Sequence, residues 1–491
     1  MMNRATSLSP ALASRTLLTS LIVTLAAGCP GRPEEPAPNE GEGEGEGEGE
    51  GEGEGEGEGE GEGEGEGEGE GEGEAPVLSL AHAKQGMSGA LVDLDGDGVD
   101  DKVVGAPLAT WGDAVGVVLV YGGTALGFER EPFLQLTGHD HLGSSMVRLH
   151  DVDSDGFDEL AVGAITGTGS ETALSGTVVI YRGGHSGEVL ATLSAGQPAA
   201  KFGYALARGD LNDDGIDDLV VGAPFETPSA ALYQQGGVHV FLGPAFTTHL
   251  PLLASSINKG LGWAVAVGDI DADGVDDLLL GASTKALGYR GSSTFAPALD
   301  TPDLTVTSAA TNFARSLAVT NEYLLLGAYR ANVGGQRDTG ALFVVTKAAL
   351  PRTVDLGAPS ADLVVTINGP ALFARFAASL CAVGDVDNDG HGDVVVGASG
   401  ADVDLSDMRG RAYYFPGSTL GAATTLANAS TFSGTNRFQY FGATCAVDDD
   451  QRTLIGAPGD GGEVGRSFVF DLVTRLPVPG GESGGPTGVS P

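Results

Sequence analysis

Residues 210–224 read Asp-Leu-Asn-Asp-Asp-Gly-Ile-Asp-Asp-Leu-Val-Val-Gly-Ala-Pro, and this stretch decides the fold because it recurs along the chain. Near copies, each an acidic loop that runs into apolar residues and Gly-Ala, stand at 93–107, 151–164, 269–283 and 385–399. Weaker copies that keep only the apolar end stand at 323–328 and 453–458. Repetition at a fixed period is the signature of a repeat architecture. The sequence therefore contains seven repeats, numbered one to seven below.

The spacing of the repeats indicates the size of each structural unit. The Gly-Ala glycines at 105, 163, 222, 281, 327, 397 and 456 are separated by 58, 59, 59, 46, 70 and 59 residues. Such steps are too long for a helical hairpin and fit four short strands with their turns. In repeat three, apolar runs at 202–208, 219–224, 237–242 and 250–254 supply those strands. We therefore expect an all-β, seven-bladed β-propeller of four-stranded antiparallel blades.

The ends of the repeat region indicate how the ring closes. Repeat seven has no apolar run after 466–472 to serve as a fourth strand, whereas Val77-Leu78-Ser79-Leu80-Ala81 precedes repeat one. We expect this N-terminal strand at 77–81 to pair with the C-terminal blade, because that pairing leaves no unmatched inner edge. The predicted propeller then covers residues 75–474, and the Pro-Gly-rich residues 475–491 form a disordered tail.

Five repeats carry a loop whose donors suit a hard cation. Carboxylates or an amide stand at loop positions 1, 3, 5 and 9, a glycine that permits a sharp turn stands at 6, and position 7 offers a main-chain carbonyl. We call these loops one, two, three, four and six after their repeats. Their candidate metal ligands are Asp93, Asp95, Asp97, Val99 and Asp101; Asp151, Asp153, Asp155, Phe157 and Glu159; Asp210, Asn212, Asp214, Ile216 and Asp218; Asp269, Asp271, Asp273, Val275 and Asp277; and Asp385, Asp387, Asp389, His391 and Asp393.

Oxygen donors in this number favour Ca²⁺, since Mg²⁺ demands a tighter octahedral arrangement. We expect about five structural Ca²⁺ ions that clip strand pairs together, so that metal binding contributes folding free energy. An ion that bridges to a ligand and a catalytic metal are the alternatives. Repeats five and seven have shortened loops, which we expect to hold no calcium.

The motifs taken together resemble a known repeat. Leu142-Gly143, Phe202-Gly203, Leu261-Gly262 and Phe441-Gly442 open repeats, and the acidic loop and Gly-Ala follow in the same order. This set resembles the FG-GAP repeat of integrin α-subunit propellers and of many bacterial surface proteins. Phe313-Ala314 in repeat five departs from it. The resemblance implies a calcium-binding propeller that acts in adhesion.

The N-terminus resembles that of an exported bacterial lipoprotein. Arg4 and Arg15 precede an apolar run at 17–27, which is too short to span a membrane and is typical of a signal peptide. The run ends in Leu25-Ala26-Ala27-Gly28-Cys29, which is similar to a lipobox and implies cleavage after residue 28 and lipidation of Cys29. Pro30 then implies the outer membrane or cell surface. Ordinary signal cleavage, giving a secreted or periplasmic protein, is the alternative.

Charge is concentrated in two places along the chain. Residues 29–40 are a short Pro/Glu-rich segment, and 41–74 are uninterrupted Gly-Glu pairs, which cannot bury a core and are expected to form a disordered linker. The formal net charge is −42, and residues 1–74 hold three Arg against twenty Glu. The five acidic loops contain 24 Asp or Glu, nearly all the excess charge of the propeller. A nucleic-acid partner is therefore excluded, because its phosphates would be repelled.

The remaining reactive residues do not form a catalytic motif. His139 and His141 are close only in sequence and are expected in a solvated turn. Cys381 and Cys445 occupy equivalent first-strand positions; we expect them buried and not facing each other, with a disulfide as the alternative. No nucleophile motif or phosphate loop is present, so we expect no enzyme.

Aromatic side chains in the variable loops are the expected partner-reading residues: Trp111, Phe225, Tyr233, Tyr289 and Tyr329. The sequence favours a surface-tethered, non-catalytic binding or adhesion module for a protein or glycan. A hydrolase or lyase built on the propeller, and a purely structural surface component, are the alternatives.

Overall fold

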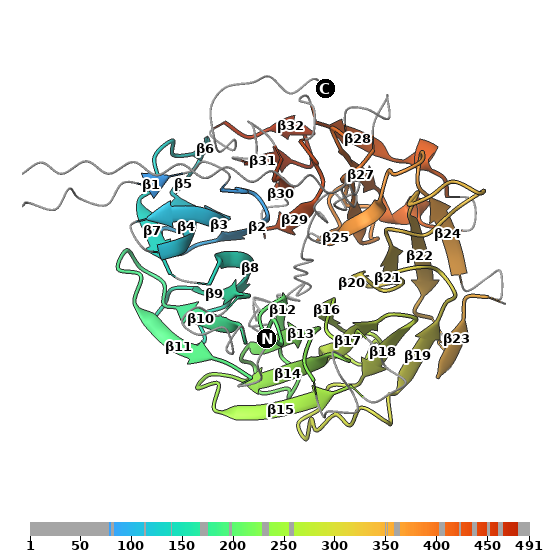
Figure 1. The fold of residues 1–491 in the computed structure, drawn as a ribbon, viewed down its shortest axis with the longest axis horizontal. Helices are drawn as coiled ribbons and strands as arrows, with labels where there is room; N and C mark the ends of the chain where they lie inside the picture. The colour runs from blue at the N-terminus through green and yellow to red at the C-terminus, as the bar shows by residue number, and fades with distance from the viewer. Residues whose placement is uncertain are drawn as a thin grey trace, which may run out of the picture.

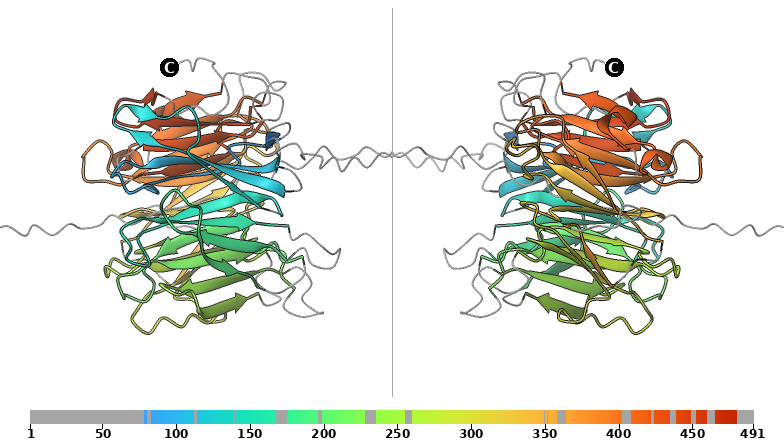
Figure 2. Two further views of the ribbon diagram at one scale, coloured as in Figure 1. Left: turned by 90° about the vertical axis from the view of Figure 1, so that its left-hand side faces the viewer. Right: turned by 90° about the vertical axis from the view of Figure 1, so that its right-hand side faces the viewer.

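A computed structural model of the chain shows an all-β propeller whose strands are arranged around a central axis (Figure 1). From the side the strands form a thick disc (Figure 2). Within the described residues the helical elements are two 3-10 turns, η1 (Gly417–Thr419) and η2 (Leu426–Asn428). The structure describes residues 78–79, 83–111, 114–138, 140–166, 175–195, 199–227, 235–254, 260–348, 350, 352–357, 364–401, 408–421, 424–434, 439–448, 452–459 and 465–479.

Repeat three forms the predicted four-stranded antiparallel blade. Its strands are β12 (Ala205–Gly209), β13 (Asp218–Ala223), β14 (Gly237–Leu242) and β15 (Thr248–Leu253), paired in sequence order. Every residue of β13 is buried, because neighbouring blades cover both faces, whereas most of β15 is exposed or half-exposed at the rim. This explains why the inner strands read as unbroken apolar runs in the sequence.

Four further repeats form separate blades of the same plan. Their strands are β16 (Val265–Gly268), β17 (Asp277–Ala282), β18 (Lys285–Tyr289) and β19 (Leu304–Thr307); β20 (Ser316–Val319), β21 (Tyr323–Ala328), β22 (Ala341–Thr346) and β24 (Val364–Asn368); β25 (Phe376–Gly384), β26 (Asp393–Ala398), β27 (Arg411–Phe415) and β28 (Ser430–Ser433); and β29 (Thr444–Val447), β30 (Arg452–Ala457), β31 (Arg466–Asp471) and β32 (Leu476–Pro477). Repeats three to seven thus give five separate blades.

The expectation of seven separate four-stranded blades is wrong for the first two repeats. They share one nine-stranded sheet of β1 (Leu78–Ser79), β2 (Ser88–Val92), β3 (Asp101–Trp111), β4 (Ala114–Tyr121), β7 (Leu134–Thr137), β8 (Leu142–Leu149), β9 (Glu159–Ala164), β10 (Thr177–Tyr181) and β11 (Val189–Leu193), beside a small hairpin of β5 (Gly123–Thr124) and β6 (Gly127–Phe128). A single parallel bridge, Gly116 with Leu142, joins the two halves. The same kind of bridge recurs between later repeats as Gly236–Leu261, Gly340–Phe376 and Gly410–Phe441.

The predicted closure is wrong. The described part of the N-terminal segment, β1, pairs with β3 of its own repeat, Leu78 opposite Trp111, and not with the C-terminal blade. Val77, Leu80 and Ala81 lie outside the described residues. Repeat seven instead supplies its own fourth strand, β32, which pairs with β31 beyond the predicted end at residue 474. The ring closes through contact of β29 with β2 and a parallel bridge between Gln85 and Gly465.

An additional strand explains the longest step between repeats. The segment after β22 of repeat five contains β23 (Thr353–Asp355), which adds to the outer edge of the repeat-four blade, parallel to β19. Figure 1 shows β23 at the rim beside β19. Repeat five is the long one because it contains this insertion.

Small residues let the inner strands of adjacent repeats approach closely. A Cβ at Gly222 would lie 2.2 Å from the carbonyl oxygen of Gly262 in the next repeat, so no side chain fits there. Ser88 and Ser145 each donate a hydrogen bond to the carbonyl oxygen of the next repeat's Phe-Gly or Leu-Gly glycine, at 2.6 and 2.5 Å. The repeated glycines are therefore packing positions between blades.

The expectation for the two propeller cysteines is wrong. Cys381 on β25 and Cys445 on β29 are joined in a disulfide, with 6.2 Å between their Cα atoms. Both are buried. First strands converge near the axis, so equivalent positions on neighbouring strands come within disulfide distance.

Candidate metal centres

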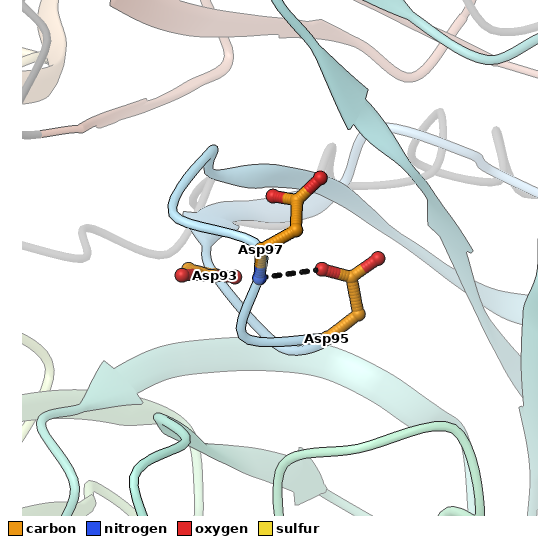
Figure 3. Close-up of side chains that lie close together, drawn as sticks. All are labelled: Asp93, Asp95 and Asp97. Atoms are coloured by element: carbon orange, nitrogen blue, oxygen red, sulfur yellow. Dashed lines mark hydrogen bonds between the residues drawn. The ribbon is translucent and has the colours of Figure 1, made fainter.

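Loop one shows how the sequence shapes each acidic loop. It connects β2 to β3, and the backbone N–H groups of Gly96 and Gly98 donate to the two carboxylate oxygens of Asp93 at 2.8 and 2.9 Å. The N–H of Asp97 donates to Asp95 at 3.1 Å, the bond drawn in Figure 3. These bonds wind the loop into a tight turn around the position-1 side chain. The structure therefore brings the ligands at positions 1, 3 and 5 together, with one carboxylate oxygen of each within 4.8 Å of the others.

The other loops repeat this arrangement with local differences. Loops two and four also bring together their carboxylates at positions 1, 3 and 5. In loop three, Asn212 at position 3 accepts from the Asp214 N–H at 3.1 Å and donates to the Asp214 carboxylate at 3.0 Å. In loop six the clustered carboxylates are those of Asp385, Asp387 and Asp393, without Asp389.

The position-7 residues hold the loop through their backbone. In each loop the N–H of position 7 donates to the carboxylate at position 5, at distances of 2.8 to 3.0 Å. Position 7 therefore needs no particular side chain. The residues found there are Val99, Phe157, Ile216, Val275 and His391.

The position-9 carboxylates, which begin the second strand of each blade, are buried. One oxygen of each accepts the N–H of position 2; in loop one Asp101 accepts from Leu94 at 3.1 Å, and in loop two Glu159 accepts from Val152 at 2.7 Å. In loops one, three, four and six, the other oxygen accepts an N–H from a residue that follows the third strand. In loop one this is the N–H of Gly123, at 2.8 Å from Asp101. Position 9 thus ties the loop to the neighbouring hairpin.

Burial disfavours the charged form of these position-9 carboxyl groups when no cation is bound. It raises the pKa of Asp101 to about 7, of Glu159 to about 8, of Asp218 to about 7 and of Asp277 to about 6, and it also raises that of Asp393. Neighbouring loop carboxylates, such as Asp95 beside Asp101, push in the same direction. A cation in the loop would reverse both effects, because it favours the charged form.

Unpartnered oxygens test whether the loops fit a metal ion. Among the described residues, both carboxylate oxygens of Asp153 and one each of Glu159 and Asp271 are buried without a hydrogen-bond partner. Each of Asp153 and Asp271 lies near an arginine, Arg182 at 3.2 Å and Arg290 at 2.9 Å. Buried oxygens without donors are costly unless a cation satisfies them. The donor set of loops two and four therefore fits a hard cation.

Repeats five and seven have other contacts at the corresponding described residues. In repeat five a short turn is closed by the N–H of Thr320 donating to the carbonyl of Tyr323 at 2.9 Å. The Lys347 ammonium donates to the Thr320 carbonyl at 3.1 Å and to the Asp269 carbonyl of loop four. In repeat seven Asp448 pairs with Arg452 at 2.6 Å. Basic side chains thus lie beside both shortened turns.

Comparisons with known proteins match these loops and their strands. Three segments, residues 202–241, 261–294 and 376–415, match the FG-GAP repeat, and each contains one acidic loop. The chain is a β-propeller that contains FG-GAP repeats in these three segments. Integrin alpha-4 of Xenopus laevis is 33% identical over 179 residues, which are 34% of this chain and 16% of the relative.

Other relatives of the FG-GAP propeller are of two kinds. Integrin alpha-IIb of Mus musculus is 33% identical over 227 residues, 42% of this chain and 21% of the relative. Phosphatidylinositol-glycan-specific phospholipase D of Rattus norvegicus is 32% identical over 145 residues, 26% of this chain and 17% of the relative. The matches thus span about a fifth or less of each relative. The crystal structure of BBS1N in complex with ARL6DN, soaked with lead, is 11% identical, with TM-score 0.43 and coverage of 83% of this chain and 94% of that one.

The FG-GAP propeller also contains buried ion pairs that sequence reasoning missed. Arg148 at the end of β8 lies 3.1 Å from Asp100 of loop one and 2.7 Å from Asp158 of loop two. In repeat three, Arg208 lies 2.8 Å from Asp217. Burial alone would raise the pKa of Asp217, but Arg208 and the bonds with His150 hold it well below its usual range. The available signal was an aspartate at loop position 8 together with an arginine ending the first strand.

The predicted partner-reading aromatics of the FG-GAP propeller are only partly where expected. Phe225 lies in the connection after the second strand, its ring 5.1 Å from that of Trp263, which sequence reasoning did not single out. Tyr289 instead ends the third strand β18 and is buried, because the β17–β18 hairpin is tight. Trp111 ends β3 and is half-buried, as is Tyr329 after β21. Tyr233 lies outside the described residues.

The described residues include no helix long and apolar enough to cross a membrane. Cys29, the apolar run at 17–27 and the Gly-Glu segment lie outside the described residues, as does His139. His141 bonds with the Thr166 hydroxyl at 2.6 Å.

Proposed function

We propose that this chain is an exported calcium-binding propeller that acts as a non-catalytic binding module for a protein or glycan partner. The observation that carries the proposal is the recurrence of one loop, with clustered carboxylates at positions 1, 3 and 5 in loops one, two and four. FG-GAP matches and integrin alpha relatives support a binding role. Each Ca²⁺ would supply the positive charge that offsets repulsion among the carboxylates of its loop. All twenty-five candidate ligands, from Asp93 to Asp393, belong to this proposal.

We propose that the ring contains seven blades, with the shared sheet of repeats one and two counted as two blades. The single bridge Gly116–Leu142 that joins the nine-stranded sheet has counterparts between repeats whose blades are separate sheets. The innermost strands β2, β8, β12, β16, β20, β25 and β29 contact one another in turn, and β29 contacts β2. We therefore infer that repeats one and two each contribute a blade, and that the ring lies within residues 75–479.

Tethering completes the proposed function. Signal cleavage before Cys29, lipidation of that cysteine and the linker at 41–74 would hold the propeller away from an outer membrane. A Cys29→Ser variant is then expected in the soluble fraction. Recovery of this variant in the membrane fraction, at the level of the unaltered protein, would contradict the anchor.

Calorimetry of the metal-free protein with Ca²⁺ tests the metal sites. We expect a stoichiometry near five and a large fall in melting temperature on adding EGTA, because bound ions stabilise the folded state by mass action. A stoichiometry of one or two would contradict the five-site proposal.

A pull-down from surface extracts, with Ca²⁺ or with EGTA, tests the binding role. The test variant is Phe225→Ala, which removes a predicted partner-reading aromatic from a connection outside the acidic loops and should weaken capture in Ca²⁺. Capture of a partner only in Ca²⁺ supports the proposal. Turnover of a glycan or phosphodiester by the purified protein would favour an enzyme instead, the direction suggested by the phospholipase D relative.

A further inference from the structure

A cavity of about 260 Å³ lies beside loop four, between the β18–β19 connection and the insertion that follows β22. Its apolar wall is formed by Ile270 and Leu304, which are buried, and by Leu350, which is half-buried. Of these, Leu350 comes from the long repeat five, which adds a strand to its neighbour's blade. The cavity is therefore a feature of this one junction and not of the repeat.

The polar lining is balanced in charge. Three carboxylates face it, from Asp271, Asp277 and Asp303, together with three cationic side chains, from Arg290, Lys347 and Arg352. The Arg290 guanidinium lies 2.9 Å from the Asp271 carboxylate, and that of Arg352 lies 3.9 Å from Asp303. An anion or a cation entering the cavity would meet a like charge beside each opposite one.

Fixed donors and acceptors alternate around this lining. Asp303 accepts the Arg290 backbone N–H at 3.1 Å, and one oxygen of Asp271 has no hydrogen-bond partner among the described residues. The Lys347 ammonium donates hydrogen bonds to the Thr320 and Asp269 carbonyls, which fix its position. A ligand whose groups both donate and accept satisfies such a lining best, and hydroxyl groups do both.

We propose that this cavity binds one neutral sugar residue of a glycan partner. Its size lies near the lower end for small-molecule sites, and the apolar wall of Leu304 and Leu350 can cover the carbon face of a ring whose hydroxyls reach the Asp and Arg groups. This inference rests on the proposed binding function and names its ligand class. Asp271 and Asp277 belong both to the cavity and to loop four, so calcium and sugar binding are coupled.

Titration of the full-length protein in Ca²⁺ with methyl glycosides of glucose, galactose, mannose and N-acetylglucosamine tests this inference. Glucuronate and glucosamine serve as charged probes of the same size. We expect at least one neutral glycoside to bind. Leu350→Trp, which fills the cavity, and Asp303→Ala, which removes an acceptor, should each raise its Kd by about tenfold or more.

The matched control is Glu188→Ala, an exposed acid before the fourth strand of repeat two that pairs with Arg182 at 4.0 Å. This variant should bind the glycoside like the unaltered protein. Melting temperatures and Ca²⁺ stoichiometry of all three variants show whether a loss of binding reflects unfolding or loss of loop four.

Three outcomes would overturn the inference: no neutral glycoside binds, only a charged probe binds, or binding survives both cavity variants. Suppose that one of these outcomes is found, and that the unaltered chain and Leu350→Trp both still capture a protein partner from surface extracts in Ca²⁺. The sugar site is then wrong, whereas the proposed binding function stands. If neither a partner nor a sugar is bound, both fall.

Discussion

At the scale of single residues, an acidic loop combines side chains that shape it with side chains that have spare oxygens. At position 1, Asp93, Asp210, Asp269 and Asp385 use both oxygens on backbone N–H groups of the loop, which fixes the turn. Asp153, at position 3 of loop two, has two buried oxygens without a hydrogen-bond donor among the described residues. Removing the carboxylate at position 3 should therefore weaken metal binding more than it disturbs the fold of the loop.

Asp153→Asn should remove one calcium site. Bound at about a hundredfold over its Kd, one ion contributes about 2.7 kcal/mol to stability, so the variant should melt lower in Ca²⁺ and bind one ion fewer. In EGTA the two proteins should melt alike or the variant higher, because a repulsive charge is gone. The matched control is Asp213→Asn, an exposed acid at position 4 of loop three. Unchanged stoichiometry in Asp153→Asn would contradict the assignment.

The Gly-Ala glycines have a packing role that a single substitution can test. The missing side chain of Gly222 would meet the Gly262 carbonyl at 2.2 Å, a backbone atom that cannot move aside. Gly222→Ala should therefore cost about 1–3 kcal/mol of unfolding free energy, measured by denaturant unfolding. Gly421→Ala, where a Cβ meets nothing within 4 Å, is the control and should change stability little. Equal stability of both variants would argue against contact between the blades there.

At the scale of elements, the inner strands could be predicted from sequence, whereas two short edge strands could not. β13 and its counterparts are buried on both faces, which requires unbroken apolar runs such as Leu219-Val220-Val221. The edge strands β23 and β32 have only two or three residues, and β23 pairs with a strand of the preceding repeat. Such pairings depend on where the chain returns in space, so no local pattern indicates them.

The candidate loops were predictable for a related reason, whereas their ion pairs were not. Ligand spacing is set within nine residues of chain, and the carboxylates at positions 1, 3 and 5 lie together in loops one, two and four. Arg148 contacts acids from two different repeats, a relation visible only once blades lie side by side.

The fourth strand of repeat seven gives a prediction about the C-terminus. β32 covers the edge of β31 through pairs of Phe470 with Pro477 and Asp471 with Leu476. Truncation after Arg475 should expose that edge and lower the melting temperature, whereas truncation after residue 480 retains β32 and should leave the melting temperature unchanged. Deleting residues 75–82, which contain β1, tests the competing closure. If that deletion abolishes cooperative unfolding while removal of β32 has no effect, the N-terminal strand closes the ring after all.

At the scale of the whole molecule, the ring depends on contacts between first strands, and one of these is covalent. The expectation that Cys381 and Cys445 would not face each other assumed that equivalent positions simply follow each other around the ring. Near the axis β25 and β29 are so close that their Cα atoms are 6.2 Å apart at these positions. The bond links repeats six and seven, next to the junction of β29 with β2 that closes the ring.

Replacing both cysteines with alanine should therefore destabilise the ring as a unit. The disulfide closes a loop with a sequence separation of 64 residues, for which chain entropy gives about 4 kcal/mol. The double variant should show a lower denaturant midpoint in one cooperative transition, and a reductant should lower the midpoint of the unaltered protein to the same value without affecting the variant. A Cys381→Ala or Cys445→Ala variant leaves the other propeller cysteine with a free thiol. Thiol titration after unfolding should detect that thiol. A reductant-insensitive midpoint in the unaltered protein, with both propeller thiols titratable, would show that the bond is not formed and that the ring is held by packing alone.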